Sequence, residues 1–220
     1  MSPTPRTTSR RPCRTRRVLA TGTLAVTVPV LRTRALHWGA TTAEATMPLP
    51  GDDLVPNPDL TATRAVGIDT DPADVWPWVA QLGQGRGGFY SYDALENLVG
   101  CDIHSADRIE PRWQSPRVGD VVRLAPQVGL DVAAVEPGRA LVLHGAVAPG
   151  GEAGGTPPYD FSWAFVVLPA AGGSTRLVVR ERYAYTTWWA PVLVEPVSWL
   201  SLLMSRKMLR GIRERAERPA

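Results

Sequence analysis

The chain has 220 residues, of which 44% are hydrophobic and 20% are charged. This length fits one ordinary domain with an additional segment, and a domain of this size can fold without a disulfide or a metal. The composition is globular and excludes a fibrous or wholly disordered chain. The 20 Gly and 21 Pro residues predict many turns and few long helices.

Charge is distributed unevenly along the chain, whose net charge is +3. Residues 1–36 contain eight Arg and no acidic residue, and residues 206–220 contain six basic residues against Glu214 and Glu217. The remaining residues, 37–205, therefore hold ten basic and 19 acidic groups. An acidic body argues against a nucleic-acid-binding domain, which would present a basic face. The basic ends could still contact an anionic membrane weakly.

The two cysteines, Cys13 and Cys101, are too few for a disulfide framework, and no C-x-x-C motif is present. Three His residues and these two Cys residues lack the spacing of zinc ligands. We therefore expect two free thiols in a reducing compartment, no metal site and no cofactor.

The N-terminal segment is basic and then apolar. Residues 1–17 are rich in Arg, Thr, Ser and Pro, which favours disorder. Residues 18–31 are mostly apolar but fall short of the roughly 20 residues that span a membrane. Arg32 and Arg34 follow where a secretory signal would have its cleavage site. We expect a disordered basic leader over 1–36 and a cytoplasmic protein, with a membrane-surface anchor or export as alternatives.

The first half of the remaining chain predicts an arm, a strand and two helices. Four Pro residues interrupt residues 37–61, which predicts an irregular arm. Alternating apolar residues over 61–68 predict a strand. Asp71 and Pro72 then begin a helix that ends at the glycine-rich segment 83–88. A second short helix is expected over 92–99.

The second half is rich in predicted strands. These fall at 118–124, 130–135, 140–144, 161–168 and 175–185, and a long amphipathic helix covers 192–217. An antiparallel sheet must bury one face, and the long helix is the obvious cover. The order predicts an α+β fold over 62–217, in which a curved antiparallel sheet wraps around the C-terminal helix. Space between a curved sheet and a helix is usually a ligand pocket.

Several segments of the sequence resemble a known family. The most specific one is VWPWVAQLGQGRGGFYSYD, residues 75–93. The others are residues 37–41, 49–52, 95–97, 102–104, 106–109 and 206–212. Together they resemble an uncharacterised, actinobacterial-type branch of the START-like, or SRPBCC, superfamily of polyketide cyclase/dehydrase-like proteins, over residues 37–217.

That resemblance implies a helix-grip fold with a cavity for an apolar or amphipathic small molecule. The superfamily includes lipid carriers, cyclases, hydrolases and hormone receptors, so the fold does not fix the function. We expect binding of a lipid, polyketide or aromatic metabolite. A cyclase- or hydrolase-type enzyme and a membrane-peripheral protein are the alternatives. The sequence is silent on the oligomeric state.

Polar residues between 86 and 107 are the candidates for acid/base chemistry. His104 lies between Asp102 and Asp107, and a carboxylate can orient an imidazole and raise its pKa. Glu96 would have a raised pKa if a pocket wall buried it, which suits a general base. Tyr90 completes the candidate catalytic set. Each of these residues could instead brace a loop.

Further residues are candidates for ligand contacts. Arg86 in the glycine-rich segment could pair with an acidic group of a ligand, although this segment matches no phosphate-binding motif and could be only a tight corner. Arg180 and Arg182 share one face of a strand and Glu181 and Tyr183 share the other, and the sequence does not decide which face is inner. The remaining candidates for ligand contact are Tyr92, Trp78, Trp163 and Trp199, although most of the Trp residues should lie in the core.

Overall fold

The computed structural model describes residues 30–98, 100–146 and 157–218. The chain divides into two units, residues 1–34 and residues 35–220. Most of the predicted leader, including Cys13, lies outside the described residues. The second unit contains the sheet and the long C-terminal helix.

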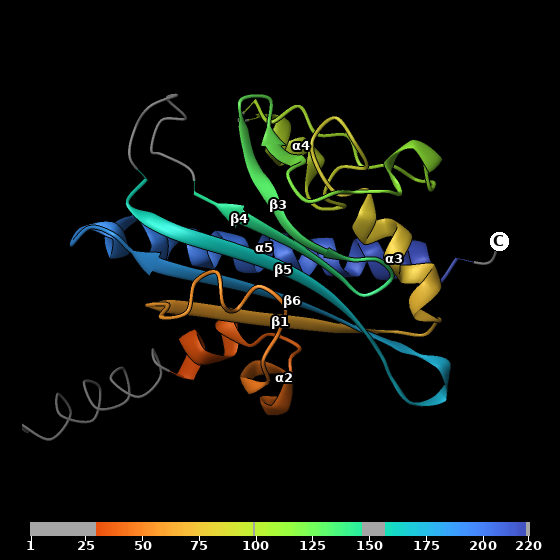
Figure 1. Cartoon of the computed structure of the whole chain (residues 1–220), viewed down its shortest axis with the longest axis horizontal. Coiled ribbons are helices and arrows are strands. Elements are labelled where there is room, and N and C mark those ends of the chain that lie inside the picture. The colour runs from red at the N-terminus through yellow and green to blue at the C-terminus, as the bar shows by residue number, and fades with distance from the viewer. Residues whose placement is uncertain (1–29, 99, 147–156, 219–220) are drawn as a thin grey trace, which may run out of the picture. The chain divides into compact units, whose positions relative to one another are not determined.

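A single six-stranded antiparallel sheet forms the centre of this unit (Figure 1). Its spatial order is β1-β6-β5-β4-β3-β2, so β1 pairs with the last strand and not with its neighbour in sequence. The strands are β1 (Leu60–Ile68), β2 (Val121–Ala125), β3 (Val128–Glu136), β4 (Ala140–Gly145), β5 (Tyr159–Pro169) and β6 (Thr175–Tyr185). The register shifts once between β2 and β3 and once between β3 and β4, and such bulges bend a sheet.

The helices after the first strand follow the predicted order, whereas the short helix in the arm was not predicted. The α-helices are α2 (Thr42–Thr46), α3 (Pro72–Ala80), α4 (Asp93–Leu98) and α5 (Ala190–Ala216). Helix α5 runs along one face of the sheet (Figure 1). The main core lies between them and includes Phe165, Leu177, Leu209 and Ile212. This arrangement confirms the α+β helix-grip fold.

Membrane spans are not found among these helices. None of the helices in the described ranges combines the length and apolar composition that crossing a bilayer requires. Helix α5 has enough residues, but Glu195, Arg206 and Lys207 already fall within its first 18 residues.

The arm covers the other face of the sheet, where a second apolar cluster forms. Val142, Val166 and Val178 from the sheet pack there with Leu49 of the arm. The arm is more regular than its prolines suggest, because it contains α2. A capping box begins this short helix: the Thr41 hydroxyl accepts from the Glu44 amide, and the Glu44 carboxylate accepts from the Thr41 amide.

Arg180 on β6 attaches the arm to the sheet. Its side chain is only 3% exposed. One terminal nitrogen donates to Asp52 Oδ2 at 2.7 Å and to the Met47 carbonyl at 2.8 Å. The other donates to the carbonyls of Glu44 and Ala45, which α2 leaves without helical partners. The guanidinium therefore neutralises a carboxylate and closes the end of a helix.

The two neighbouring arginines on this face also bind the arm. Arg176 donates to both carboxylate oxygens of Glu44, at 2.7 and 2.8 Å, and Arg182 lies 3.3 Å from Asp52 Oδ1 and donates to the Val55 carbonyl. The arginine face of β6 is therefore neither a solvated stripe nor a pocket wall. This placement corrects the expectation that Arg180 and Arg182 contact a ligand in the cavity.

The arginine contacts predict the effect of an Arg180→Ala substitution. It leaves Asp52 without its main cation and three carbonyls without donors, so we expect a loss of about 3 kcal/mol or more in the free energy of unfolding. Urea denaturation measures this loss, and limited proteolysis should cut the variant within residues 41–58. The control is Arg139→Ala, which removes an exposed ion pair with Glu136 and should cost less than about 1 kcal/mol. Equal effects of the two substitutions would contradict the anchoring role.

Candidate functional site

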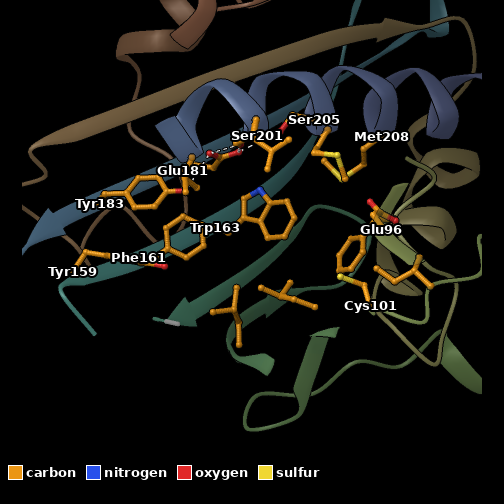
Figure 2. Close-up of a pocket in the computed structure, with 17 residues that line it drawn as sticks. Glu96, Cys101, Tyr159, Phe161, Trp163, Glu181, Tyr183, Ser201, Ser205 and Met208 are labelled. Carbon is orange, nitrogen blue, oxygen red and sulfur yellow. Dashed lines mark hydrogen bonds between the residues drawn. The ribbon is translucent and has the colours of Figure 1, made fainter. Parts of the chain in front are cut away.

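A cavity of about 300 Å³ lies between the sheet and α5 (Figure 2). Most of its walls are apolar or aromatic. The residues that line it are Phe89, Glu96, Cys101, Ile103, Leu124, Leu130, Tyr159, Phe161, Trp163, Glu181, Tyr183, Val197, Leu200, Ser201, Met204, Ser205 and Met208.

The lining side chains follow the two-residue repeat of a strand on β5 and β6 and the three- to four-residue repeat of a helix on α5. On β5 and β6 the lining residues alternate, as in Phe161 and Trp163 and in Glu181 and Tyr183, because every second side chain of a strand faces the same way. On α5 they recur every three or four residues, which places them on one helical face. The helical residues are Val197, Leu200, Ser201, Met204, Ser205 and Met208.

Aromatic rings form a continuous wall along β5 and β6. The ring centroids of Phe161 and Tyr183 lie 4.5 Å apart, and those of Trp163 and Phe89 lie 5.9 Å apart with nearly parallel planes. Trp163 lies in the middle of the cavity wall, between Glu181 and Glu96 (Figure 2). Its indole Nε1 is buried and has no hydrogen-bond partner. The wall is therefore apolar with one unused donor.

Glu181 lies at one end of the cavity, where its charge is fully compensated. Arg64 Nη1 lies 2.7 Å from Glu181 Oε1, and both side chains are buried. The Ser201 hydroxyl lies 2.6 and 2.7 Å from the two carboxylate oxygens, and the Ser205 hydroxyl lies 3.2 Å from Oε1. The Tyr183 hydroxyl adds a longer contact of 3.5 Å to Oε2. This network joins β1, β6 and α5 and leaves Glu181 little capacity for a ligand.

Glu96 lies at the other end, on α4, and is not compensated. Its residue is 7% exposed, and its Oε2 atom is buried without a hydrogen-bond partner. The pKa of the Glu96 carboxyl is raised from 4.5 to about 7, mainly by burial and also by the neighbouring charge of Asp93, while a hydrogen bond from Ser91 opposes the shift. The ionised carboxylate is therefore poorly stabilised at neutral pH.

The predicted catalytic set does not converge on this cavity. Only Glu96 lines it. His104 is 82% exposed and lies 3.3 Å from Asp102, away from the cavity walls. Tyr90 is buried in the core, where its hydroxyl donates to the Trp78 carbonyl and accepts from Gln81, and burial raises the pKa of the phenol.

The predicted ligand contacts are also mostly elsewhere. Trp163 lines the cavity, whereas Trp78 packs edge-on against Tyr90 in the core. Tyr92 and Trp199 are exposed and do not line the cavity. Arg86 donates to the carbonyls of Ala80 and Trp113, both at 2.9 Å, so its role in the described structure is to hold a corner of the chain.

The glycine-rich segment 83–88 is a structural corner. Gly83 and Gly88 exchange backbone hydrogen bonds, and the Gly87 amide donates to the Gln81 carbonyl. The Gln84 amide donates to the Arg123 carbonyl. Backbone amides committed in this way are not free to bind a phosphate. Within the described residues, no three His, Cys, Asp or Glu side chains gather as a metal site would require.

Sequence reasoning missed Ser201 and Ser205 on the cavity wall and Arg64 behind it. The alternation of β6 had placed Glu181 and Tyr183 on one face, but it did not say that this face is inner. Ser201 and Ser205 share a helical face with the Met residues, and that spacing was the available signal. Nothing in the sequence pairs Arg64 with Glu181, because they are 117 residues apart.

Comparisons with known proteins give distant structural likenesses. No family model and no curated protein matches the chain. Protein MLL2253 from Mesorhizobium loti is 14% identical, with a TM-score of 0.44 over 73% of this chain and 99% of that one. Protein Ms6760 from Mycobacterium smegmatis is 13% identical, with a TM-score of 0.42 over 70% of this chain and 89% of that one.

A third likeness is DynU16, described as a protein in the dynemicin biosynthetic locus. It is 16% identical, with a TM-score of 0.39 over 70% of this chain and 47% of that one. At these identities and scores, none of the three likenesses carries an argument about ligand or activity.

The burial of Glu96 predicts a pH-dependent stability. The unfolded chain ionises this carboxyl near 4.5 and the folded chain near 7, so the folded state holds an extra proton between these values. Stability therefore falls as pH rises from about 4.5 to 7, by up to about 3 kcal/mol. A glutamine at this position cannot ionise, so Glu96→Gln avoids this loss. The unfolding free energy of the variant minus that of the unchanged protein should therefore rise by up to about 3 kcal/mol from pH 4 to pH 8.

Chemical denaturation at several pH values measures this difference. The Glu136→Gln substitution serves as the control, because it makes the same chemical change in an exposed ion pair and should cost less than about 1 kcal/mol. If the Glu96→Gln curve ran parallel to that of the unchanged protein, Glu96 would not titrate as a buried group.

Proposed function

We propose that this chain is a START-like helix-grip protein that binds an apolar or amphipathic small molecule in the cavity between its sheet and α5. The observation that carries the proposal is the cavity itself. Protein interiors are close-packed and leave few voids larger than a water molecule, whereas this one measures about 300 Å³. That volume is at the lower end of the range of small-molecule sites.

The chemistry of the walls supports such a ligand. Aromatic and aliphatic side chains such as Phe161, Trp163 and Leu130 favour an apolar body. The unused Trp163 Nε1 donor and Glu96 Oε2 favour a ligand that also carries a polar group. A few polar atoms on apolar walls are typical of sites that orient an amphipathic guest.

Access to the cavity runs beside α5. Val197 and Leu200 line the cavity and are also exposed to solvent, so the cavity meets the surface along this part of the helix. A ligand could enter there without separation of the strands.

The two alternatives receive less support. The acid/base residues proposed for an enzyme, His104, Glu96 and Tyr90, do not share a cavity wall. A membrane-peripheral role needs free basic groups, but Arg215 pairs with Asp107, Arg213 pairs with Glu217, and Arg206 stacks on the ring of Trp38. The two ion pairs reduce the positive charge that the C-terminal end offers to a membrane, and the contact with Trp38 restricts the Arg206 side chain.

Filling the cavity tests the binding function. Leu124→Trp adds a ring to a partly buried wall residue, so it should occupy space that a guest needs. Calorimetric titration with 2-naphthylmethanol should show binding to the unchanged protein and binding at least tenfold weaker to this variant. The matched control is Leu168→Trp, because Leu168 packs on the arm side of the sheet.

Affinity in the control variant should stay within about threefold of the unchanged protein. Binding that Leu124→Trp does not weaken would contradict the assignment of the site, and a thermal unfolding curve for each variant checks that both are folded.

A further inference from the structure

The charged residues that line the cavity, among those the structure describes, are all acidic. Among the described residues that line it, Glu96 and Glu181 are charged and none is Lys, Arg or His. Arg64 lies behind the wall and is already paired with Glu181 at 2.7 Å. An ionised Glu96 is therefore the one carboxylate of this lining without a countercharge.

Among the described residues around Glu96, the charge that acts on its carboxyl is negative. On its own helix, Asp93 is another acid, whose carboxylate accepts hydrogen bonds from the amide and hydroxyl of Ser105. The Cys101 thiol belongs to the following loop, and burial together with the charge of Glu96 raises its pKa. Met204 and Met208 line the cavity from α5 and are uncharged.

Burying an ionised carboxylate without a partner costs desolvation free energy. That free energy is recovered only when a hydrogen-bond donor or a cation binds the carboxylate. Trp163 also brings an aromatic ring to the cavity wall, and the face of an indole attracts a positive charge. Both features favour the same kind of ligand head group. A carboxylate guest would instead bring a second negative charge into a cavity that has no cation to receive it.

We propose, on the basis of the binding function above, that the guest is an apolar amine whose protonated amino group binds the Glu96 carboxylate while its hydrocarbon or aromatic body lies against the ring wall. The cavity then discriminates against fatty acids and other carboxylate amphiphiles. Glu181, held by Arg64 and the two serines, is a structural group and does not select the ligand.

Three 2-naphthyl probes that differ in the head group test the preference by calorimetric titration at pH 8: 2-naphthylmethylamine, 2-naphthylmethanol and 2-naphthoate. The amine should bind at least tenfold more tightly than the alcohol, and the carboxylate should bind most weakly. In Glu96→Gln the advantage of the amine over the alcohol, measured as the ratio of their two affinities in that variant, should fall below threefold. Glu136→Gln, an exposed matched change, should keep the full advantage.

Acidification gives a second readout. The advantage of the amine should decline from pH 8 to pH 5.5, because protonation of Glu96 removes its charge while the amine stays protonated. Binding of the alcohol should be nearly constant over this range.

The outcomes separate the two proposals. If the alcohol binds but the amine binds no better, or if Glu96→Gln leaves the amine preference intact, the amine assignment is wrong and the binding function stands. If none of the three probes binds, the binding function itself is contradicted.

Discussion

The alternation of side chains along β6 connects the two layers that cover the sheet. Arg176, Arg180 and Arg182 face the arm, where they neutralise its carboxylates and bind its carbonyls. Glu181 and Tyr183, on the opposite face, meet α5 and the cavity. Because a shift of one residue would exchange these faces, the pairing register of β6 with β1 and β5 determines both how the arm is held and which groups the cavity contains.

Helix α5 leaves a cavity because it approaches the rest of the unit unevenly. At Gly211 a Cβ atom would lie only 2.4 Å from the Tyr90 carbonyl oxygen, so the helix comes very close to that segment. Nearer its N-terminus, Ser201 and Ser205 bind Glu181, and the neighbouring residues face the cavity. The buried charge pair of Arg64 and Glu181 thus fixes the helix at a defined position while the apolar walls stay apart.

Much of the fold was predictable from sequence, because strands and helices have distinct hydrophobic periods. The alternation over 175–185 and the amphipathic pattern after residue 192 predicted β6 and α5 nearly to their observed ends. Helix α2 was missed, although Thr41 and Glu44 have the spacing of a capping box. A helix of five residues depends on such a cap and on Arg180, which is distant in sequence.

The site was less predictable, because it depends on contacts between distant segments. Glu96 and Trp163 were selected, and they do line the cavity. His104 and Arg86 were selected for their residue types, but they lie on different loops, where His104 is exposed to solvent and Arg86 binds backbone carbonyls. The roles of Arg180 and Glu181 follow from which layer covers each face of β6, and sequence periodicity alone contains no such information.

The central claim is that the sheet and α5 enclose a space that the protein's own side chains do not fill. A crystal structure under xenon pressure tests it most directly, since xenon enters apolar cavities. The account predicts a xenon atom among Phe161, Trp163 and Met208. Side chains closed over that space, with no xenon between the sheet and the helix, would contradict it.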